Sequence, residues 1–397
     1  MLNLQSVAGN EAGMLSHAMR TVLERVDRPV ADANGLPNSF YLSQDFFHLE
    51  REILFDRGWA ACGFSADVAN VGAVYPLDYL GRPAVLVRDS EDRVQAFHNV
   101  CRHRGMILVR EPSAKNKLLR CPYHSWCYDL KGKLLRTPKI GQDDTDHSDE
   151  FDISSIGLTP IATREWMGVV YINFDGKAGD FGEYIAPLQE RWAAFMNAPL
   201  WHDSARQFDL KVRCNWKLAV ENYCESYHLP WVHPSLNSYS RIEDHYDILV
   251  KGNYSGQGTN VYSQRIGEGK AFCDHKGLEK FWQTGAEYIA MYPNVLYGAH
   301  RDHFYAMLLM PDGHGSTTER TLISYYDDYG KDKAKHGLMQ DHADQWRGVF
   351  EEDIFAVEGM QAGRESPEFD GGRFTPSRDS ATHCFHDWVA KLFLAEA

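Results

Sequence analysis

The sequence is short of basic residues and has no long apolar run, no internal repeat and no low-complexity tract. Lys and Arg number 41 against 55 Asp and Glu, so the 397 residues carry a formal net charge of −14. Because phosphate binding needs a basic surface, this balance disfavours a nucleic-acid partner. The lack of repeats and biased segments excludes solenoids and linker-rich architectures. We interpret the acidic charge first as a solvated surface, and second as a docking face for a basic partner protein.

No segment has about 18 continuous apolar residues, the length that a membrane-spanning helix requires. The first residues, MLNLQSVAGNEAGMLSHAMR, lack the positive start and long apolar run of a secretion signal. We therefore expect a cytoplasmic protein with no membrane partner. Eight cysteines are too few for a disulfide scaffold in so long a chain, so metal binding is the more informative interpretation of their spacing.

Apolar patterning predicts a helical start, a small β-rich domain and a larger α+β region. Helices are expected at 13–26 and 43–59, the second with Ser43 as its N-cap. Short β-rich runs from 71 to 174 predict a small antiparallel β domain, with 139–152 as an acidic surface loop. Beyond it the pattern predicts a helix and then four strands, at 185–196, 246–250, 287–291, 304–310 and 318–326. Helices near both ends of this region are expected to flank the strands.

Two short Cys/His pairs form the first candidate metal site. Cys101-x-His103 and Cys121-x-x-His124 are separated by seventeen residues, and each lies between β runs. Structural zinc is the competing interpretation, because Cys2His2 sets also bind zinc. Zinc fingers usually place both cysteines first, whereas here each loop supplies one of each residue. That order allows the cysteines to bind one iron of a [2Fe-2S] cluster and the histidines the other, the division found in Rieske centres.

The surrounding residues strengthen this interpretation. The segment resembles Rieske domains also in Arg104-Gly105 after the first pair and in Pro122-Tyr123 and Ser125-Trp126 around the second histidine. Replacing two thiolates by neutral imidazoles raises the reduction potential, so such a cluster is a moderate electron donor. Cys127 lies outside the pattern and is expected to be a packed thiol.

The segment NWKLAVENYCESYHLPWVHPSLNSY holds the second candidate site. Glu225 and His228 are three residues apart and share a helix face, but His233 follows His228 by five, about 140° round an ideal helix. Pro230 and Pro234 interrupt the helix, so the chain can bend the two imidazoles together. Two histidines and one carboxylate on one face of an iron leave positions open for dioxygen and substrate, so a third ligand is required.

A helix expected over 344–361 offers that ligand. Asp353 falls on its apolar stripe, whereas Glu351 and Glu352 are expected to point elsewhere. The stripe consists of Trp346, Val349, Phe350, Val357 and Met360. Because an unpaired buried carboxylate is costly, a metal partner is a natural solution, with a salt-bridged core aspartate as the alternative.

The pattern E-N-x-x-E-x-Y-H-x4-H, followed by a distant E-D on a helix, resembles the mononuclear iron motif of Rieske-type non-haem iron oxygenases. The resemblance implies that His228, His233 and Asp353 ligate iron, and that Asn222 and Glu225 have catalytic roles. Glu225 occupies the position of the carboxylate that, in the family, links the Rieske domain of one subunit to the mononuclear iron of its neighbour in a trimer. The best-known ring dioxygenases have Asp there, and Glu occurs among relatives that act on quaternary ammonium compounds.

The resemblance to catalytic (alpha) subunits implies an α+β fold with a Rieske antiparallel β domain and a helix-over-antiparallel-sheet (START/SRPBCC-like) catalytic domain. We expect an N-terminal helical segment, 1–42, packing on the catalytic domain, a Rieske domain at 43–180 and the catalytic domain at 181–397. Two groups of residues resemble metal-site residues but are expected to be structural. They are His383, Cys384 and His386 in a packed C-terminal helix, and Cys224 as a small buried hydrophobe.

The function expected from this resemblance is that of a terminal oxygenase. A separate NAD(P)H-dependent flavin/iron-sulfur reductase would feed electrons to the [2Fe-2S] cluster, which passes them through His124 or His103 and Glu225 to a neighbouring subunit's mononuclear Fe(II). We predict O2-dependent hydroxylation of a small substrate next to a quaternary or tertiary nitrogen, leading to N-dealkylation or C-N cleavage. The alternatives are cis-dihydroxylation of an aromatic ring and an electron-transfer protein without oxygen chemistry.

Overall fold

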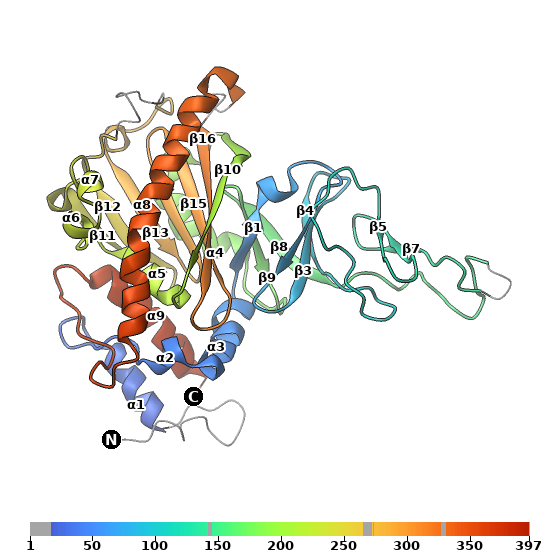
Figure 1. Cartoon of the computed structure of the whole chain (residues 1–397), viewed down its shortest axis with the longest axis horizontal. Coiled ribbons are helices and arrows are strands. Elements are labelled where there is room, and N and C mark those ends of the chain that lie inside the picture. The colour runs from blue at the N-terminus through green and yellow to red at the C-terminus, as the bar shows by residue number, and fades with distance from the viewer. Residues whose placement is uncertain (1–16, 142–144, 265–271, 273, 327–330, 397) are drawn as a thin grey trace. The chain divides into compact units, whose positions relative to one another are not determined.

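The structure is a computed structural model that describes residues 17–141, 145–264, 272, 274–326 and 331–396 (Figure 1). The chain forms two compact units, one from 57–178 and the other from 1–56 together with 179–397. Among the described residues, no helix combines the length and apolar character needed to cross a bilayer. Residues 13–16 of the first expected helix lie outside the described residues, and its remainder forms α1 (His17–Val26).

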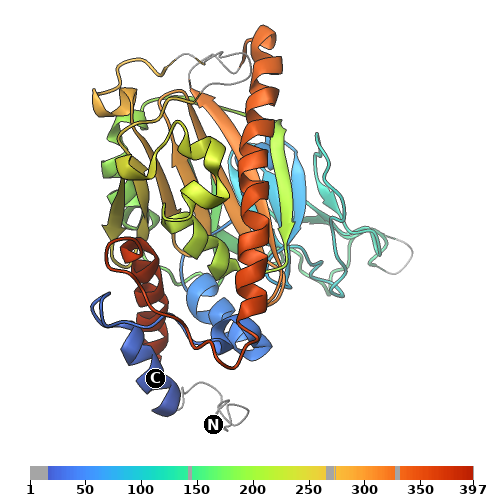
Figure 2. The ribbon, with the colours of Figure 1, turned by 60° about the vertical axis from the view of Figure 1, so that its left-hand side comes forward.

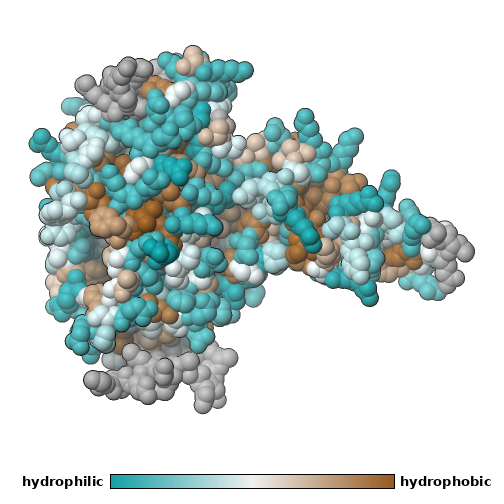
Figure 3. Space-filling view, in the orientation of Figure 1, coloured by the Kyte–Doolittle hydropathy of each residue, from teal (hydrophilic) through white to brown (hydrophobic). Residues whose placement is uncertain are grey.

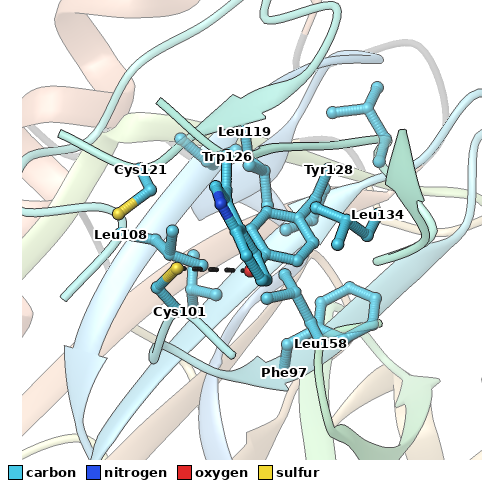
Figure 4. Close-up of a cluster of buried hydrophobic side chains, with 13 residues drawn as sticks. Phe97, Cys101, Leu108, Leu119, Cys121, Trp126, Tyr128, Leu134 and Leu158 are labelled. Carbon is cyan, nitrogen blue, oxygen red and sulfur yellow. Dashed lines mark hydrogen bonds between the residues drawn. The ribbon is translucent and has the colours of Figure 1, made fainter. Parts of the chain in front are cut away.

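Unit 57–178 is the small antiparallel β domain. A six-stranded sheet has the order β1-β9-β8-β4-β3-β2, and β5-β6-β7 form a second, three-stranded sheet. The strands are β1 (Ala60–Phe64), β2 (Val74–Asp78), β3 (Pro83–Arg88), β4 (Val94–His98), β5 (Leu119–Arg120), β6 (Cys127–Tyr128), β7 (Leu134–Arg136), β8 (Pro160–Trp166) and β9 (Val169–Asn173). An apolar cluster that includes Phe97, Leu119 and Leu134 fills the space beside Cys101 and Cys121 (Figure 4). The cysteines of the first candidate site therefore lie at a packed core.

The other unit is built on a seven-stranded antiparallel sheet with the order β10-β16-β15-β14-β13-β12-β11. The strands are β10 (Leu200–Val212), β11 (His245–Val250), β12 (Tyr254–Thr259), β13 (Ala286–Met291), β14 (Val295–Ala299), β15 (His303–Pro311) and β16 (Thr317–Tyr326). The four strands expected at 246–250, 287–291, 304–310 and 318–326 are confirmed as β11, β13, β15 and β16. The sequence pattern did not reveal β10, β12 or β14.

Helices cover both faces of this sheet. The long α8 (His336–Gly363) lies across one face (Figure 2), and α5 (Trp216–Cys224) packs against both α8 and α9 (Ser380–Ala395). On the other face, α4 (Phe181–Arg191) ends with Arg191 bound to Glu287 of β13 at 2.7 Å. The shorter helices are α2 (Ser39–Leu42), α3 (Gln44–Glu50), α6 (Leu229–Val232) and α7 (Pro234–Asn237). The helix expected at 344–361 is confirmed as part of α8, and the one expected at 185–196 starts earlier, as α4, and ends in the 3₁₀ turn Ala193–Phe195.

The second expected helix, 43–59, ends at Asp56 and belongs to the larger unit, so the β domain starts later than expected. Ser43 is the N-cap, as expected, and accepts from the Phe46 N–H at 3.4 Å, but α3 passes into a π-helical stretch, Arg51–Asp56, and ends there. The β unit starts at Arg57 instead of residue 43 because residues 43–56 belong to the larger core. There, buried Glu50 forms an ion pair with buried Lys217 of α5 at 2.5 Å.

Candidate metal centres

The two Cys/His loops of unit 57–178 have the same backbone geometry. The Cys101 N–H donates to the carbonyl of Met106 at 2.8 Å, and the Cys121 N–H donates to the carbonyl of Trp126 at 2.8 Å. In each loop the N–H of the residue four positions after the cysteine donates to the cysteine carbonyl at 3.0 Å. These residues, Gly105 and Ser125, have positive φ angles of +72° and +59°. Glycine adopts this conformation freely, whereas Ser125 bears a steric cost there. Matching loops present both pairs of side chains in equivalent positions.

Burial separates the sulfur ligands from the nitrogen ligands. Cys101 and Cys121 are 2% and 1% exposed, whereas His103 is exposed and His124 is half-buried. The two imidazole rings lie 4.6 Å apart, and His103 stacks on Trp126 at 10° between ring planes. A cluster between these side chains would have its cysteine-bound iron in the core and its histidine-bound iron toward the surface.

A buried tyrosine hydroxyl lies against one of the sulfurs. The Tyr128 hydroxyl accepts from the Arg102 N–H at 3.1 Å and lies 3.3 Å from the Cys101 Sγ (Figure 4). Burial is the main cause that raises the pKa of Tyr128 and also that of the Cys101 thiol. Because Tyr128 keeps its proton, it can donate to a metal-bound thiolate. Iron would supply the stabilisation of the thiolate that the apolar surroundings do not.

The second candidate site forms where the chain leaves α5. Glu225 is extended, His228 precedes the short α6, and His233 separates α6 from α7 with a non-helical φ of −121°. Pro230 lies in the first turn of α6 and Pro234 begins α7. The prolines thus fall where one regular helix is replaced by short pieces, as the sequence analysis expected.

This broken segment brings His228 and His233 to Asp353 of α8. Asp353 Oδ1 lies 2.9 Å from His233 Nε2 and 3.8 Å from His228 Nε2. Among the residues that the structure describes, these three form the one trio of His, Cys, Asp or Glu whose ligand atoms all lie within 4.8 Å of one another. The Cys/His side chains of the β unit are therefore not gathered round a single point, as four tetrahedral zinc ligands would be.

Each histidine of the trio has a second carboxylate on its other ring nitrogen. Glu225 Oε1 lies 2.6 Å from His228 Nδ1, and Glu352 Oε2 lies 2.7 Å from His233 Nδ1. A histidine held in this way through Nδ1 directs its Nε2 lone pair to a metal. Glu352 lies off the apolar stripe, as expected, and its side chain is 44% exposed, but its contact with the outer nitrogen of His233 was not foreseen.

The charges at this site fit a cation. Burial works against a charge on His233, but the contacts with Asp353 and Glu352 outweigh it and raise the pKa of this histidine. Asn222 Nδ2 donates to Asp353 Oδ1 at 2.8 Å, which fixes the carboxylate relative to α5. Two imidazoles and one carboxylate are the donor set of non-haem Fe(II) sites with open positions. The residues present thus suit the metal that the motif implied.

A cavity opens onto the trio. It encloses about 440 Å³ of empty space, part of it open to solvent, and its lining includes all three residues and Asn222. Trp346, Val349, Phe350 and Asp353 line it from one face of α8. Four of the five residues of the predicted stripe, all except Met360, are at least half-buried, whereas Met360 is 38% exposed. The helix face that carries Asp353 therefore forms one wall of the cavity.

The His383, Cys384 and His386 group and Cys224 have structural contacts, as expected. In α9, His386 Nδ1 accepts from the Leu36 N–H at 3.0 Å and His383 Nε2 donates to the Val26 carbonyl at 3.0 Å. Cys384 and Cys224 are buried, and Cys224 Sγ lies 3.4 Å from Ser255 Oγ. Cys127 is also a buried thiol, as expected.

Comparison with known proteins agrees with both centres. Residues 58–155 match the Rieske [2Fe-2S] domain family, and residues 201–395 match the family described as the ring hydroxylating alpha subunit (catalytic domain). Choline monooxygenase of Spinacia oleracea is 30% identical over 377 residues, which cover 91% of this chain and 79% of that protein. The carnitine monooxygenase oxygenase subunit of Escherichia coli (strain K12) is 27% identical over 383 residues, covering 91% and 94%.

The fold agrees as well. The crystal structure of the quaternary ammonium Rieske monooxygenase CntA superimposes with a TM-score of 0.75 at 22% identity, covering 93% of this chain and 98% of that one. A Rieske [2Fe-2S] domain is thus joined to a catalytic domain of the kind that holds mononuclear iron, and an electron-transfer protein has no need of the second. The chain belongs to the Rieske non-haem iron oxygenases.

Proposed function

We propose that this oxygenase hydroxylates a carbon next to a quaternary or tertiary nitrogen in a small substrate. The observation that carries the proposal is the cavity, in which aromatic side chains and the three candidate ligands face the same space. Tyr223, Tyr305, Trp346 and Phe350 contribute rings to this lining, and the faces of such rings attract cations. The names of the relatives, choline and carnitine monooxygenase, support the same substrate class.

His228, His233 and Asp353 would hold the mononuclear iron, which when bound supplies the activation of dioxygen. Glu225 keeps a proton on Nδ1 of His228, so that Nε2 stays free to bind metal. Asn222 holds Asp353 through one oxygen and limits its rotation. One oxygen atom enters the C–H bond and the other leaves as water with two electrons and two protons. The resulting carbinolamine breaks its C–N bond and releases an aldehyde.

Cys101, Cys121, His103 and His124 would hold the Rieske cluster, which when bound supplies the electrons one at a time. We propose that the electrons come from a separate NAD(P)H-dependent reductase and that Glu225 connects this site to the Rieske domain of a neighbouring subunit in a trimer. Glu225 suits this role because its second oxygen accepts from the backbone N–H groups of Tyr227 and His228. The carboxylate is thereby held at the edge of the site.

Exposed aromatic residues near this edge support a partner surface. Trp231 and Tyr227 are 68% and 47% exposed and meet edge to face at 5.3 Å. Figure 3 shows apolar surface over α8 among polar side chains. Clustered exposed apolar residues mark interaction sites more often than scattered ones do.

The test is coupled turnover with product identification. Purified oxygenase, reductase and NADH would be supplied with choline, carnitine and glycine betaine, and with aromatic acids as the comparison. The proposal expects NADH and oxygen consumption with an amine, together with an aldehyde or hydroxylated amine as product. Turnover of aromatic acids to cis-dihydrodiols, with no product from any amine, would replace it by the ring-dihydroxylating alternative.

A further inference from the structure

Four neighbouring strands place one row of residues under the cavity. Gln257 of β12 pairs with Tyr288 of β13, Tyr288 pairs with Gly298 of β14, and Gly298 pairs with Tyr305 of β15. A Cβ on Gly298 would lie 2.2 Å from the Tyr305 ring, so glycine makes room for that ring to lie over β14. The sheet therefore presents two phenols, Tyr288 and Tyr305, to the same cavity.

The two phenols differ in their hydrogen bonds. The Tyr305 hydroxyl lies 2.9 Å from the hydroxyl of Tyr223, which itself donates to the Tyr297 carbonyl at 2.8 Å. The Tyr288 hydroxyl is buried from solvent and makes no hydrogen bond of normal geometry among the described residues, although the Ser240 side chain lies close enough to interact with it. Leaving a buried hydroxyl unpaired costs about 1–3 kcal/mol, so native structures rarely do so without reason. A group that enters the cavity can remove this cost.

The ring of Tyr288 is held in place by its neighbours. It stacks on His245 with 8° between ring planes and meets Tyr223 and His300 nearly at right angles. Tyr288 is 6% exposed. Because the ring is enclosed on several sides, its hydroxyl oxygen is held in place and only the O–H bond can turn.

The polar residues beside Tyr288 cannot supply a donor to the cavity. Gln257 Nε2 donates to the Glu225 carbonyl at 2.9 Å, which leaves its Oε1 to accept from His245 Nδ1 at 2.7 Å. His245 Nε2 then accepts from the Ser240 hydroxyl at 2.9 Å. Burial lowers the pKa of His245, in agreement with a neutral ring. The protons of Gln257, His245 and Ser240 are thus used within this group. The Tyr288 O–H, which lies near the Ser240 oxygen but forms no well-aligned bond with it, is the donor left to face a ligand.

We propose that Tyr288 donates a hydrogen bond to an oxygen atom of the substrate, a hydroxyl or a carboxylate oxygen away from the reacting carbon. The metal ligands come from α8 and the segment after α5, whereas Tyr288 lies on the sheet, so a substrate that reaches both spans the cavity. This inference rests on the proposed amine substrate. It makes Tyr288 a specificity-determining residue that separates oxygen-bearing amines from plain tetraalkylammonium ions.

Equilibrium dialysis of the iron-loaded protein tests the inference with three probes: tetramethylammonium, choline and glycine betaine. The Tyr288→Phe variant should bind choline or glycine betaine about fivefold more weakly, the loss of roughly one hydrogen bond, and tetramethylammonium as before. The probe that loses affinity identifies the oxygen as hydroxyl or carboxylate. The Tyr305→Phe variant is the matched control, because its hydroxyl already has a partner, and it should change all three affinities in parallel.

A thermal unfolding scan supplies the second measurement. Without ligand, Tyr288→Phe should unfold at or above the temperature of the unsubstituted protein, because the substitution removes an unpaired buried hydroxyl. Parallel weakening of all three probes by Tyr288→Phe, or no weakening of any, would overturn the inference alone. If the unsubstituted protein neither binds nor oxidises any of the three amines, the proposed function fails, and the inference fails with it.

Discussion

Replacing Tyr128 by Phe should lower the reduction potential of the Rieske cluster. The substitution keeps the ring, which is fully buried, and removes the hydroxyl that lies 3.3 Å from the Cys101 Sγ. A hydrogen bond to a metal-bound thiolate stabilises negative charge on sulfur. Because reduction adds one electron to the cluster, the bond is stronger in the reduced state and its loss favours the oxidised state.

The size of the shift follows from one charge-assisted bond. Hydrogen bonds to charged groups contribute about 1.5–3 kcal/mol, and if reduction strengthens this bond by about 1–2 kcal/mol, its loss lowers a one-electron potential by roughly 40–85 mV. The Arg102 N–H also loses its acceptor, so we expect some loss of stability beside the electrochemical effect. The visible spectrum of the oxidised cluster should remain.

A reductive titration followed by electron paramagnetic resonance measures the potential. Tyr123→Phe is the matched control, because Tyr123 is 58% exposed and its ring lies against His124. It should change the potential much less than Tyr128→Phe does. An unchanged or higher potential in Tyr128→Phe, with the cluster intact, would refute the assignment of Tyr128 as a donor to the cluster.

Three further predictions concern the catalytic unit. Glu352→Gln should weaken iron binding at the mononuclear site about 10–100-fold, measured by iron titration, whereas neighbouring Glu351→Gln should not. Lys217→Met should lower the free energy of unfolding by about 3–5 kcal/mol in denaturant titrations, because it leaves Glu50 buried without its cation, and adding Glu50→Gln should recover part of the loss. The pKa of Glu221 is lowered from its usual 4.5 to about 2, because nearby cations outweigh its burial. Its contribution to stability is therefore complete above pH 4.5 and lost as the pH falls toward 2; Glu221→Gln should flatten acid unfolding curves there, and unaltered curves would contradict this.

The two candidate metal-binding patterns could be recognised in the sequence because their spacing is local. The pairs Cys101/His103 and Cys121/His124 each lie within one loop, and the apolar stripe of α8 indicated the inward position of Asp353. Glu352 was missed because helix periodicity assigns one direction to each side chain. A histidine ring from another segment can reach two adjacent positions through its two nitrogens, and no pattern within the helix records this.

Long-range packing explains the other misses. Strand β12, YSGQGT, contains Gly256 and Gly258, which weaken a strand prediction, but a Cβ at Gly256 would lie 2.0 Å from the Tyr288 carbonyl of the neighbouring strand. Glycine is needed there for a reason that only the paired strand reveals. In the same way, residues 43–56 were assigned to the β domain because nothing in their local sequence shows that Glu50 binds Lys217, which is 167 positions away in the other unit.

The most direct test of the account is the His228→Ala variant, assayed for iron, acid-labile sulfide, visible spectrum and amine turnover in one preparation. The account predicts one iron fewer per chain, unchanged sulfide and Rieske spectrum, and no oxygenated product. His383→Ala is the control, because His383 packs in α9 and should keep all the iron and the activity. Full iron content and continued turnover in His228→Ala would show that the trio of His228, His233 and Asp353 is not the oxygen-activating site.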